Sequence, residues 1–335
     1  LACDQGSIAV AWQLYLPEDW AQDAERRKRA GVPESLRFAT KTQIALQQLQ
    51  TLLSEGAPRH CVLADAGYGV DTVFRQALSD MGLLYAVGVT SAVVVWPPGI
   101  EPQPPKPYGG MGRPPVVPRR TAELQPMSVK ALALSLPAQA FQTISWREGS
   151  NEPLTGRFAA VRVRHAGGNA GKARLRPQEW LLVEWPADQP EPVKYILSTL
   201  PESIPLNDLV SCAYQRWRIE RDYQDLKQDF GLGHYEGRGW RGFHHHASLS
   251  IATYAFLMAE RLIADKPAGG KKNFIERQVP ALSQDYIPRG SPSRSATRGP
   301  LDHDAAPQAH LRATRSPRPV SLLRTRKQKT TFVTQ

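Results

Sequence analysis

Residues 60–69 read His-Cys-Val-Leu-Ala-Asp-Ala-Gly-Tyr-Gly, a short apolar run that ends in a carboxylate and a glycine-rich turn. The apolar run predicts a buried strand, which places Asp65 at its C-terminal end. Carboxylates at this edge of an α/β sheet face the crevice in which ligands bind, and small residues beside them let a substrate approach the backbone. A helix cap is the alternative role, but Asp71 and Thr72 already supply a cap for a helix over 71–81. Asp65 is therefore interpreted as a site residue without a local structural role.

The segments around this strand predict an α/β core. An amphipathic helix is expected over 41–54, and further strands over 8–16 and 84–89. Residues 18–37 are charged and broken by a proline, which predicts a loop with a short helix. Beyond a proline-rich linker, alternating apolar residues predict four more strands. These strands are expected over 141–147, 156–165, 179–185 and 193–199.

A second candidate element lies in residues 214–227, which read Tyr-Gln-Arg-Trp-Arg-Ile-Glu-Arg-Asp-Tyr-Gln-Asp-Leu-Lys. On a helix, Arg216, Glu220 and Lys227 fall along one stripe. The carboxylate of Glu220 suits a hard divalent cation, while the two basic side chains suit nucleic-acid phosphates. A solvated helix face is the alternative, because such Arg/Glu pairs are common. The helix is expected to begin near Pro205 and to end at Gly231 or Gly233, and an apolar helix over 247–263 is expected to pack on the sheet.

Together these elements resemble the DDE transposases of bacterial insertion sequences. The resemblance rests on the Ala-Asp-Ala-Gly-Tyr-Gly run, on the Tyr-x-Arg-Trp-x-Ile-Glu run with its later Lys, and on residues 231–246. It implies an RNase H-like mixed sheet with flanking helices, and a β-rich insertion between the second and third acidic residues. Asp65 and Glu220 match those two acids. Arg216, Lys227 and Tyr214 match DNA or phosphate contacts, with Tyr214 ranked lowest because it lies one residue out of register, about 100° around the helix.

The resemblance also implies the chemistry. In this family three carboxylates hold two Mg²⁺ ions, with Mn²⁺ as an alternative, and the ions activate water or a DNA 3′-hydroxyl for attack on a phosphodiester. Asp65 and Glu220 would be two of the metal ligands. The implied partners are the terminal inverted repeats of the element and target DNA, bound by a homodimer in a synaptic complex.

No run in this chain matches the family's first acid. Asp4 is the nearest substitute, but the following Gln5-Gly6-Ser7 favours a turn between strands. The sequence is accordingly interpreted as a fragment without the first strand and the first catalytic Asp, and so as an inactive one. Two alternatives stay open: a DNA-binding relic of a transposase without catalysis, and a metal-dependent nuclease.

Composition sets the remaining expectations. Of 335 residues 41% are hydrophobic, enough for a sizeable core, and three scattered cysteines exclude a disulfide framework. Without an 18-residue apolar run, the chain is expected in the bacterial cytoplasm, associated with the nucleoid and not with a membrane.

Residues 288–335 contribute +8 of the net charge of +11. Residues 1–265 are therefore interpreted as an incomplete catalytic core, with the linker and insertion over about 90–202. Residues 266–335 are interpreted as a basic, largely disordered tail, or one translated in a shifted frame.

Overall fold

The computed structural model describes residues 1–3, 5–103, 105–112, 121, 125–147, 153–166 and 176–264. The expectations for Asp4, for the basic tail and for part of the proline-rich linker lie outside these residues.

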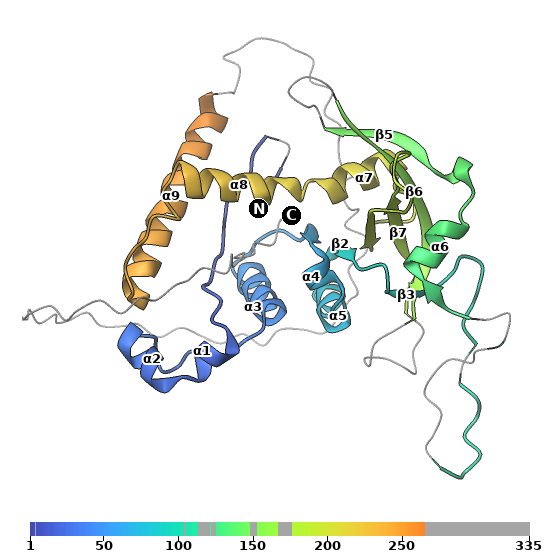
Figure 1. Ribbon diagram of the computed structural model, residues 1–335, viewed down its shortest axis with the longest axis horizontal. Coiled ribbons are helices and arrows are strands. Elements are labelled where there is room, and N and C mark those ends of the chain that lie inside the picture. Colours follow the sequence, from blue (N-terminus) through green and yellow to red (C-terminus); the bar gives the residue numbers. More distant parts are fainter. Residues whose placement is uncertain are drawn as a thin grey trace, which may run out of the picture. The chain divides into compact units, whose positions relative to one another are not determined.

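The described chain contains both helices and strands in short groups, as expected for an α/β protein (Figure 1). The strands are β1 (Cys61–Ala64), β2 (Leu84–Val89), β3 (Val94–Trp96), β4 (Met127–Ser128), β5 (Gln142–Arg147), β6 (Leu154–His165), β7 (Glu179–Glu184) and β8 (Lys194–Ser198). The helices are α1 (Glu18–Gln22), α2 (Ala24–Ala30), α3 (Lys41–Ser54), α4 (Ala66–Gly69), α5 (Thr72–Asp80), α6 (Val129–Ser135), α7 (Leu206–Tyr214), α8 (Trp217–Gln228) and α9 (Trp240–Ala264), with a 3₁₀ turn at Ala138–Ala140.

The strands form one mixed sheet of eight strands in the order β1-β2-β8-β7-β6-β3-β4, with β5 paired to β6. β1 and β2 are parallel, and β8 joins β2 in antiparallel fashion. The expected RNase H-like class of mixed sheet with flanking helices is confirmed. The strands between the second and third acidic residues do not form a separate sheet, because β8 hydrogen-bonds directly to β2 and so makes the insertion continuous with the core.

Helices cover both faces of the sheet. On one face α3, α5 and α6 pack against the strands, and Phe74, Leu78 and Val129 are fully buried there. On the other face α7 packs against β1, β2, β5 and β6 through Leu209 and Val210. Successive strand residues point to opposite faces, which is why both faces of β1 are apolar and covered.

The expected long helix before Gly231 is two helices. α7 follows Pro205 as predicted, but it ends at Tyr214, and a two-residue turn at Gln215 and Arg216 separates it from α8, which begins at Trp217. α8 ends at Gln228, ahead of Gly231, whose φ of 68° is the left-handed conformation that glycine adopts readily. α7 packs on the sheet, whereas α8 packs on α9.

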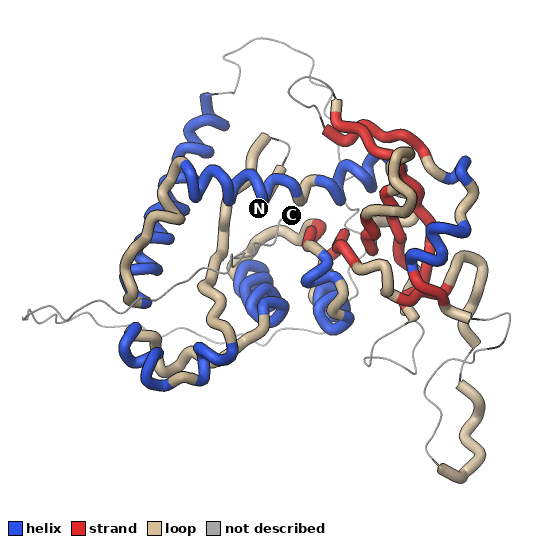
Figure 2. Tube along the Cα trace, in the orientation of Figure 1, coloured by secondary structure: helices blue, strands red, loops and turns tan. Residues whose placement is uncertain are grey.

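Two expectations for the ends of the core are wrong. Residues 8–16 are extended but pair with no described strand, and the only bridge nearby joins Ala2 to Ser7 (Figure 2). α9 packs not on the sheet but on α8 and the N-terminal segment, through Ile251 and Tyr254. An apolar pattern shows that a face is buried without showing what covers it. Among the described helices, none combines the length and the apolar composition needed to cross a membrane.

Several further short elements were not expected. The pair β3 and β4 is too short for a period-two pattern to be visible, and α6 follows directly on β4 with Ser128 as its N-cap. The charged segment expected as a loop with one short helix contains both α1 and α2, and Asp23 caps the second of them. Trp146, Trp180 and Trp185 are partly buried against the core.

A buried polar cluster lies where α5 crosses the sheet. Glu179 of β7 is 5% exposed and accepts a hydrogen bond of 2.8 Å from the Tyr85 hydroxyl of β2. Burial raises the pKa of Glu179, and the nearby charges of Arg75 and Arg176 oppose this effect without overcoming it. The ionised carboxylate is therefore destabilised by the fold.

This cluster predicts a pH dependence of stability. Between about pH 4.5, the ordinary pKa of Glu179, and its raised pKa, the folded state keeps a proton that the unfolded state has released. The free energy of unfolding should therefore fall as pH rises through this window, by up to about 1.4 kcal/mol per pH unit. Urea denaturation of the wild type and of Glu179→Gln should show the fall only in the wild type. Parallel curves for the two proteins would contradict the assignment.

Candidate active site

Asp65 sits at the end of β1, on the edge of the sheet that the sequence predicted. Its carboxylate accepts a hydrogen bond of 2.9 Å from the backbone N–H of Gly67 and caps the short helix α4. The expectation that Asp65 has no local structural role is therefore wrong. Asp71 does cap α5, as predicted, but the preceding glycine-rich turn is itself a helical turn that needs a cap. Asp65 is held in a fixed orientation as a result.

The turn after Asp65 lies directly on β2, because two glycines meet there. A methyl group placed on Gly69 would lie 1.9 Å from the carbonyl oxygen of Gly88. One placed on Gly88 would lie 3.0 Å from the backbone nitrogen of Ala66. Distances this short leave no space for a side chain. The close approach of α4 to β2 therefore fixes the backbone that carries Asp65.

Arg75 supports the same turn from α5. Its side chain is 1% exposed, and its Nη1 donates to the carbonyl oxygen of Gly69. Among the described residues its Nη2 has no hydrogen-bond partner. The buried guanidinium thus ties the last residue of α4 to the helix that follows it, and the charge of Glu179 lies close enough to interact with it.

Glu220 lies in the first turn of α8 on an exposed surface. Its side chain is 65% exposed, and Oε1 accepts a hydrogen bond of 2.8 Å from Arg216 Nη2. Arg216 and Glu220 thus form the helical ion pair that the spacing predicted. An exposed pair of this kind adds only about 0.3 to 0.5 kcal/mol to stability, so both side chains remain free to exchange partners.

The other two candidate DNA contacts, Lys227 and Tyr214, differ in environment. The Lys227 ammonium lies 5.1 Å from the centre of the Tyr223 ring on the surface of α8. Tyr214, in contrast, is 8% exposed, and its hydroxyl donates a hydrogen bond of 2.6 Å to Glu184 of β7. Tyr214 is the last residue of α7, which packs on the sheet, so its side chain lies in the core at the position where the resemblance implies a phosphate contact. The one-residue offset in the sequence agrees with that placement.

Asp65 lies on the face of the sheet that is covered by α7, the helix before the one that carries Glu220. Cys61 and Leu63 of β1 pack with α7, and in an extended strand Asp65 points to the same side as these two residues. The Cys61 thiol is hydrogen-bonded to the Cys212 thiol of α7. This hydrogen bond, together with burial, raises the pKa of Cys61. The fold thus directs Asp65 toward the side on which α7 leads into α8.

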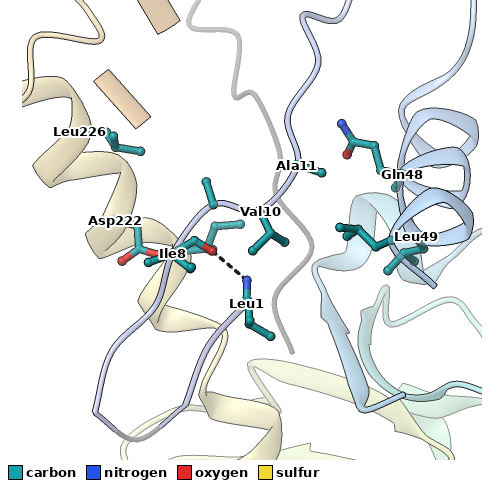
Figure 3. Close-up of a pocket in the computed structure, with 12 residues that line it drawn as sticks. Leu1, Ile8, Val10, Ala11, Gln48, Leu49, Asp222 and Leu226 are labelled. Atoms are coloured by element: carbon teal, nitrogen blue, oxygen red, sulfur yellow. Dashed lines mark hydrogen bonds between the residues drawn. The ribbon is translucent and has the colours of Figure 1, made fainter. Parts of the chain in front are cut away.

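Asp222, two residues after Glu220, is a buried carboxylate that sequence reasoning missed. It is 8% exposed and accepts hydrogen bonds from the Ser7 hydroxyl at 2.6 Å and the Tyr254 hydroxyl at 2.7 Å. These bonds join α8 to the N-terminal segment and to α9. A cavity of about 30 Å³ lies beside it, with α8 on one side and Gln48 of α3 on the other (Figure 3). Only the i+3 spacing from Ile219 hinted that Asp222 faces inward.

Carboxylate oxygens are the ligands that Mg²⁺ prefers, so the chemistry of Asp65 and Glu220 fits a divalent metal ion. Each carboxylate has one oxygen engaged, by Gly67 N–H and by the Arg216 guanidinium respectively. The described part of the chain contains no group of three His, Cys, Asp or Glu residues placed to hold a metal ion. Asp65 and Glu220 are thus two candidate ligands, where the resemblance implies three.

Comparison with known proteins agrees with the resemblance. Residues 1–153 match the sequence model of a family described as DDE superfamily endonuclease. The match includes Asp65 and the whole glycine-rich turn and stops before the segment that contains Glu220. No curated protein matches the chain.

The glycine contact predicts a large effect of one added methyl group. Gly69→Ala should lower the free energy of unfolding by about 3 kcal/mol, because its Cβ would collide with the backbone of β2 and not with a flexible side chain. Gly109→Ala is the matched control, since a Cβ there meets nothing within 4 Å. Chemical denaturation of both variants measures the difference. Equal stability of the two would show that α4 moves away from β2 at little cost.

Proposed function

We propose that this chain, which is a DDE transposase-type nuclease by its sequence over residues 1–153, is part of the transposase of a bacterial insertion sequence. The family implies a DNA substrate. The finer proposal is cleavage of DNA strands at the ends of an element and transfer of those strands to target DNA. It is supported most by one observation: Asp65 ends β1 on the face that α7 covers, and α7 leads into the helix of Glu220.

In this proposal Asp65 and Glu220 are the second and third acids. Endonucleases of this superfamily typically use divalent metal ions, and a bound metal would supply activation of water or of a 3′-hydroxyl and stabilisation of the leaving oxygen. The protein's own part is to hold the carboxylates in place. Gly67 N–H orients Asp65, and the close contact between Gly69 and Gly88 prevents its backbone from shifting. The first acid remains to be assigned.

Arg216 and Lys227 are proposed to contact DNA phosphates near this site. Both basic groups lie on α8 or at its start, and Glu220 holds the Arg216 guanidinium on the helix surface at 2.8 Å. If Glu220 bound a metal ion, the ion pair would open and the guanidinium would become available to a phosphate. The same surface would then serve both the metal and the DNA backbone.

The proposed domain organisation follows the expectation from the sequence. Residues 1–265 form the catalytic core, which includes the insertion of about 90–202 between the two acids. The basic segment over 266–335 would add nonspecific attraction to DNA, because ten of the chain's Lys and Arg residues lie after residue 287. Assembly as a homodimer with two element ends belongs to the same proposal.

Cleavage and joining assays test this function. The chain of residues 1–335, and the same chain preceded by a relative's opening strand with its Asp, are incubated with Mg²⁺, DNA carrying element ends and a target plasmid. We expect the extended protein to cut and to join 3′ ends, and Asp65→Asn or Glu220→Gln to reduce both reactions to background. Asp71→Asn is the control, because this carboxylate caps α5 and is not one of the proposed ligands.

Other outcomes would identify the alternatives. Cutting without joining would indicate a metal-dependent nuclease. A shift of element-end DNA with neither reaction in the extended protein would indicate a DNA-binding relic. If the unextended chain cut DNA and Asp4→Asn abolished this activity, Asp4 would be the first acid.

Removal of Arg216 or Lys227 should weaken DNA binding without unfolding the protein. Each lost phosphate contact is expected to reduce the slope of log K against log salt concentration by about 0.9. The melting temperature should change little, because both basic groups are solvent-accessible and Arg216 loses only an exposed ion pair. Binding of element-end DNA by Arg216→Ala and Lys227→Ala across a salt series measures the slopes. A large drop in melting temperature with an unchanged slope would assign both residues a structural role.

A further inference from the structure

We infer that the last turn of α2 and residues 237–242 at the start of α9 form a second surface that binds the phosphate backbone of duplex DNA. The inference rests on the proposed function only in taking DNA as the partner. It adds a binding surface that uses neither Asp65 nor Glu220. We call these two segments together the α2–α9 edge.

The four consecutive cations of α2 have divided roles. Arg26 forms an ion pair of 3.2 Å with Asp23, the N-cap of α2. Arg27 donates to three backbone carbonyl oxygens, those of Ala21, Pro33 and Leu36. These two side chains therefore stabilise the fold. Lys28 and Arg29 are exposed in the last turn, and no ion pair is found for either of them among the described residues.

The start of α9 brings two more cations to the same place. A methyl group on Gly239 would lie 4.0 Å from the carbonyl oxygen of Ala30, the last residue of α2. Arg238 and Arg241 flank this contact and are exposed. Figure 1 shows the N-terminal end of α9 beside α2. Four exposed cations from two distant parts of the sequence thus lie along one edge.

A packed aromatic cluster holds this edge in place. The Tyr235 hydroxyl donates a hydrogen bond of 3.2 Å to the carbonyl oxygen of Gly239. Methyl groups on Gly237 or Gly242 would lie 2.2 and 2.4 Å from the same hydroxyl, so the glycines let the ring lie against the chain. The His244 ring packs between two tryptophan rings. Its centroid lies 4.0 Å from that of Trp240 and 5.0 Å from that of Trp12 in the N-terminal segment. The arginines beside these rings are therefore presented from an ordered backbone.

The charge of the edge favours a polyanion. Residues 23–31 and 234–242 together contain six Lys and Arg and three Asp and Glu. One of the three acids, Asp23, is already neutralised by Arg26. The partial positive charge at the N-terminus of α9 adds to the same field. Exposed cations from separate elements along one edge suit the regular phosphates of a duplex better than a single small anion.

The test is the salt dependence of duplex binding by the full chain. A 30-base-pair duplex of random sequence is titrated with wild type, with Lys28→Gln/Arg29→Gln and with Arg238→Gln/Arg241→Gln. We expect each pair to reduce the slope of log K against log salt by about 1.8, since each phosphate contact contributes about 0.9. Glutamine keeps a long polar side chain at these exposed positions. The basic tail is present in every variant, so a difference in slope measures the phosphate contacts made by the α2–α9 edge.

Two controls separate local from general effects. The variant Arg59→Gln/Lys130→Gln removes the same amount of charge outside the α2–α9 edge. Arg59 donates a hydrogen bond to the carbonyl oxygen of Met81, and Lys130 forms an ion pair of 2.6 Å with Glu191. The slope of this control should equal that of the wild type. Arg238→Lys/Arg241→Lys keeps the charge and should keep the slope. If this variant loses as much slope as the glutamine variant, the two arginines act through structure and the proposal is wrong.

Unchanged slopes in both glutamine pairs, in proteins that melt at the wild-type temperature, would also overturn the proposal. Its failure is distinguishable from that of the proposed function. If the edge variants have no effect while Arg216→Ala and Lys227→Ala reduce the slope, only the edge is rejected. If the edge variants reduce the slope but no extended protein cleaves DNA, the edge stands and the transposase activity is rejected.

Discussion

The packing of α7 against one face of the sheet is the contact on which the rest of the structure depends. Leu63 of β1 and Leu209 and Val210 of α7 are buried together, with exposed fractions of 1% or less. Fully burying three such side chains contributes roughly 5 to 9 kcal/mol of hydrophobic free energy before the entropy of ordering the chain is subtracted. This contact joins the strand that ends in Asp65 to the helix pair that carries Glu220.

Side chains near the proposed site have mostly structural partners, which limits what each can do. Asp65 caps α4, Tyr214 donates to Glu184, and Asp222 accepts from two hydroxyls. The groups left toward solvent are Glu220 and its ion-pair partner Arg216. A buried polar group must be hydrogen-bonded or it destabilises the fold, so the buried Tyr214 and Asp222 are poor choices for exchange with DNA or metal, whereas Asp65 is only half-buried and its partner Gly67 is exposed. The exposure of a side chain therefore indicates better than its residue type whether it is available to bind DNA or metal.

Basic residues follow the same division. In the run of four cations in α2, two side chains are used by the fold and two remain on the surface beside the start of α9. The α8 surface carries Arg216 and Lys227 in the same way. Two separate basic surfaces would let one duplex be held away from the site while another part of it lies near the carboxylates, with each phosphate contact adding to the salt dependence of binding.

The sequence by itself determined the strands β1 and β2, the cap at Asp71 and the motif residues Asp65 and Glu220, because these depend on short-range patterns of apolar, capping and acidic residues. The tertiary structure alone decided which surfaces meet. It showed that β8 joins the insertion to the core, that the helix before Gly231 is divided in two with Tyr214 buried on the first part, and that α9 packs on α8. Periodicity reports that a face is buried but not its partner, since partners distant in the sequence are brought together only by packing of the whole chain.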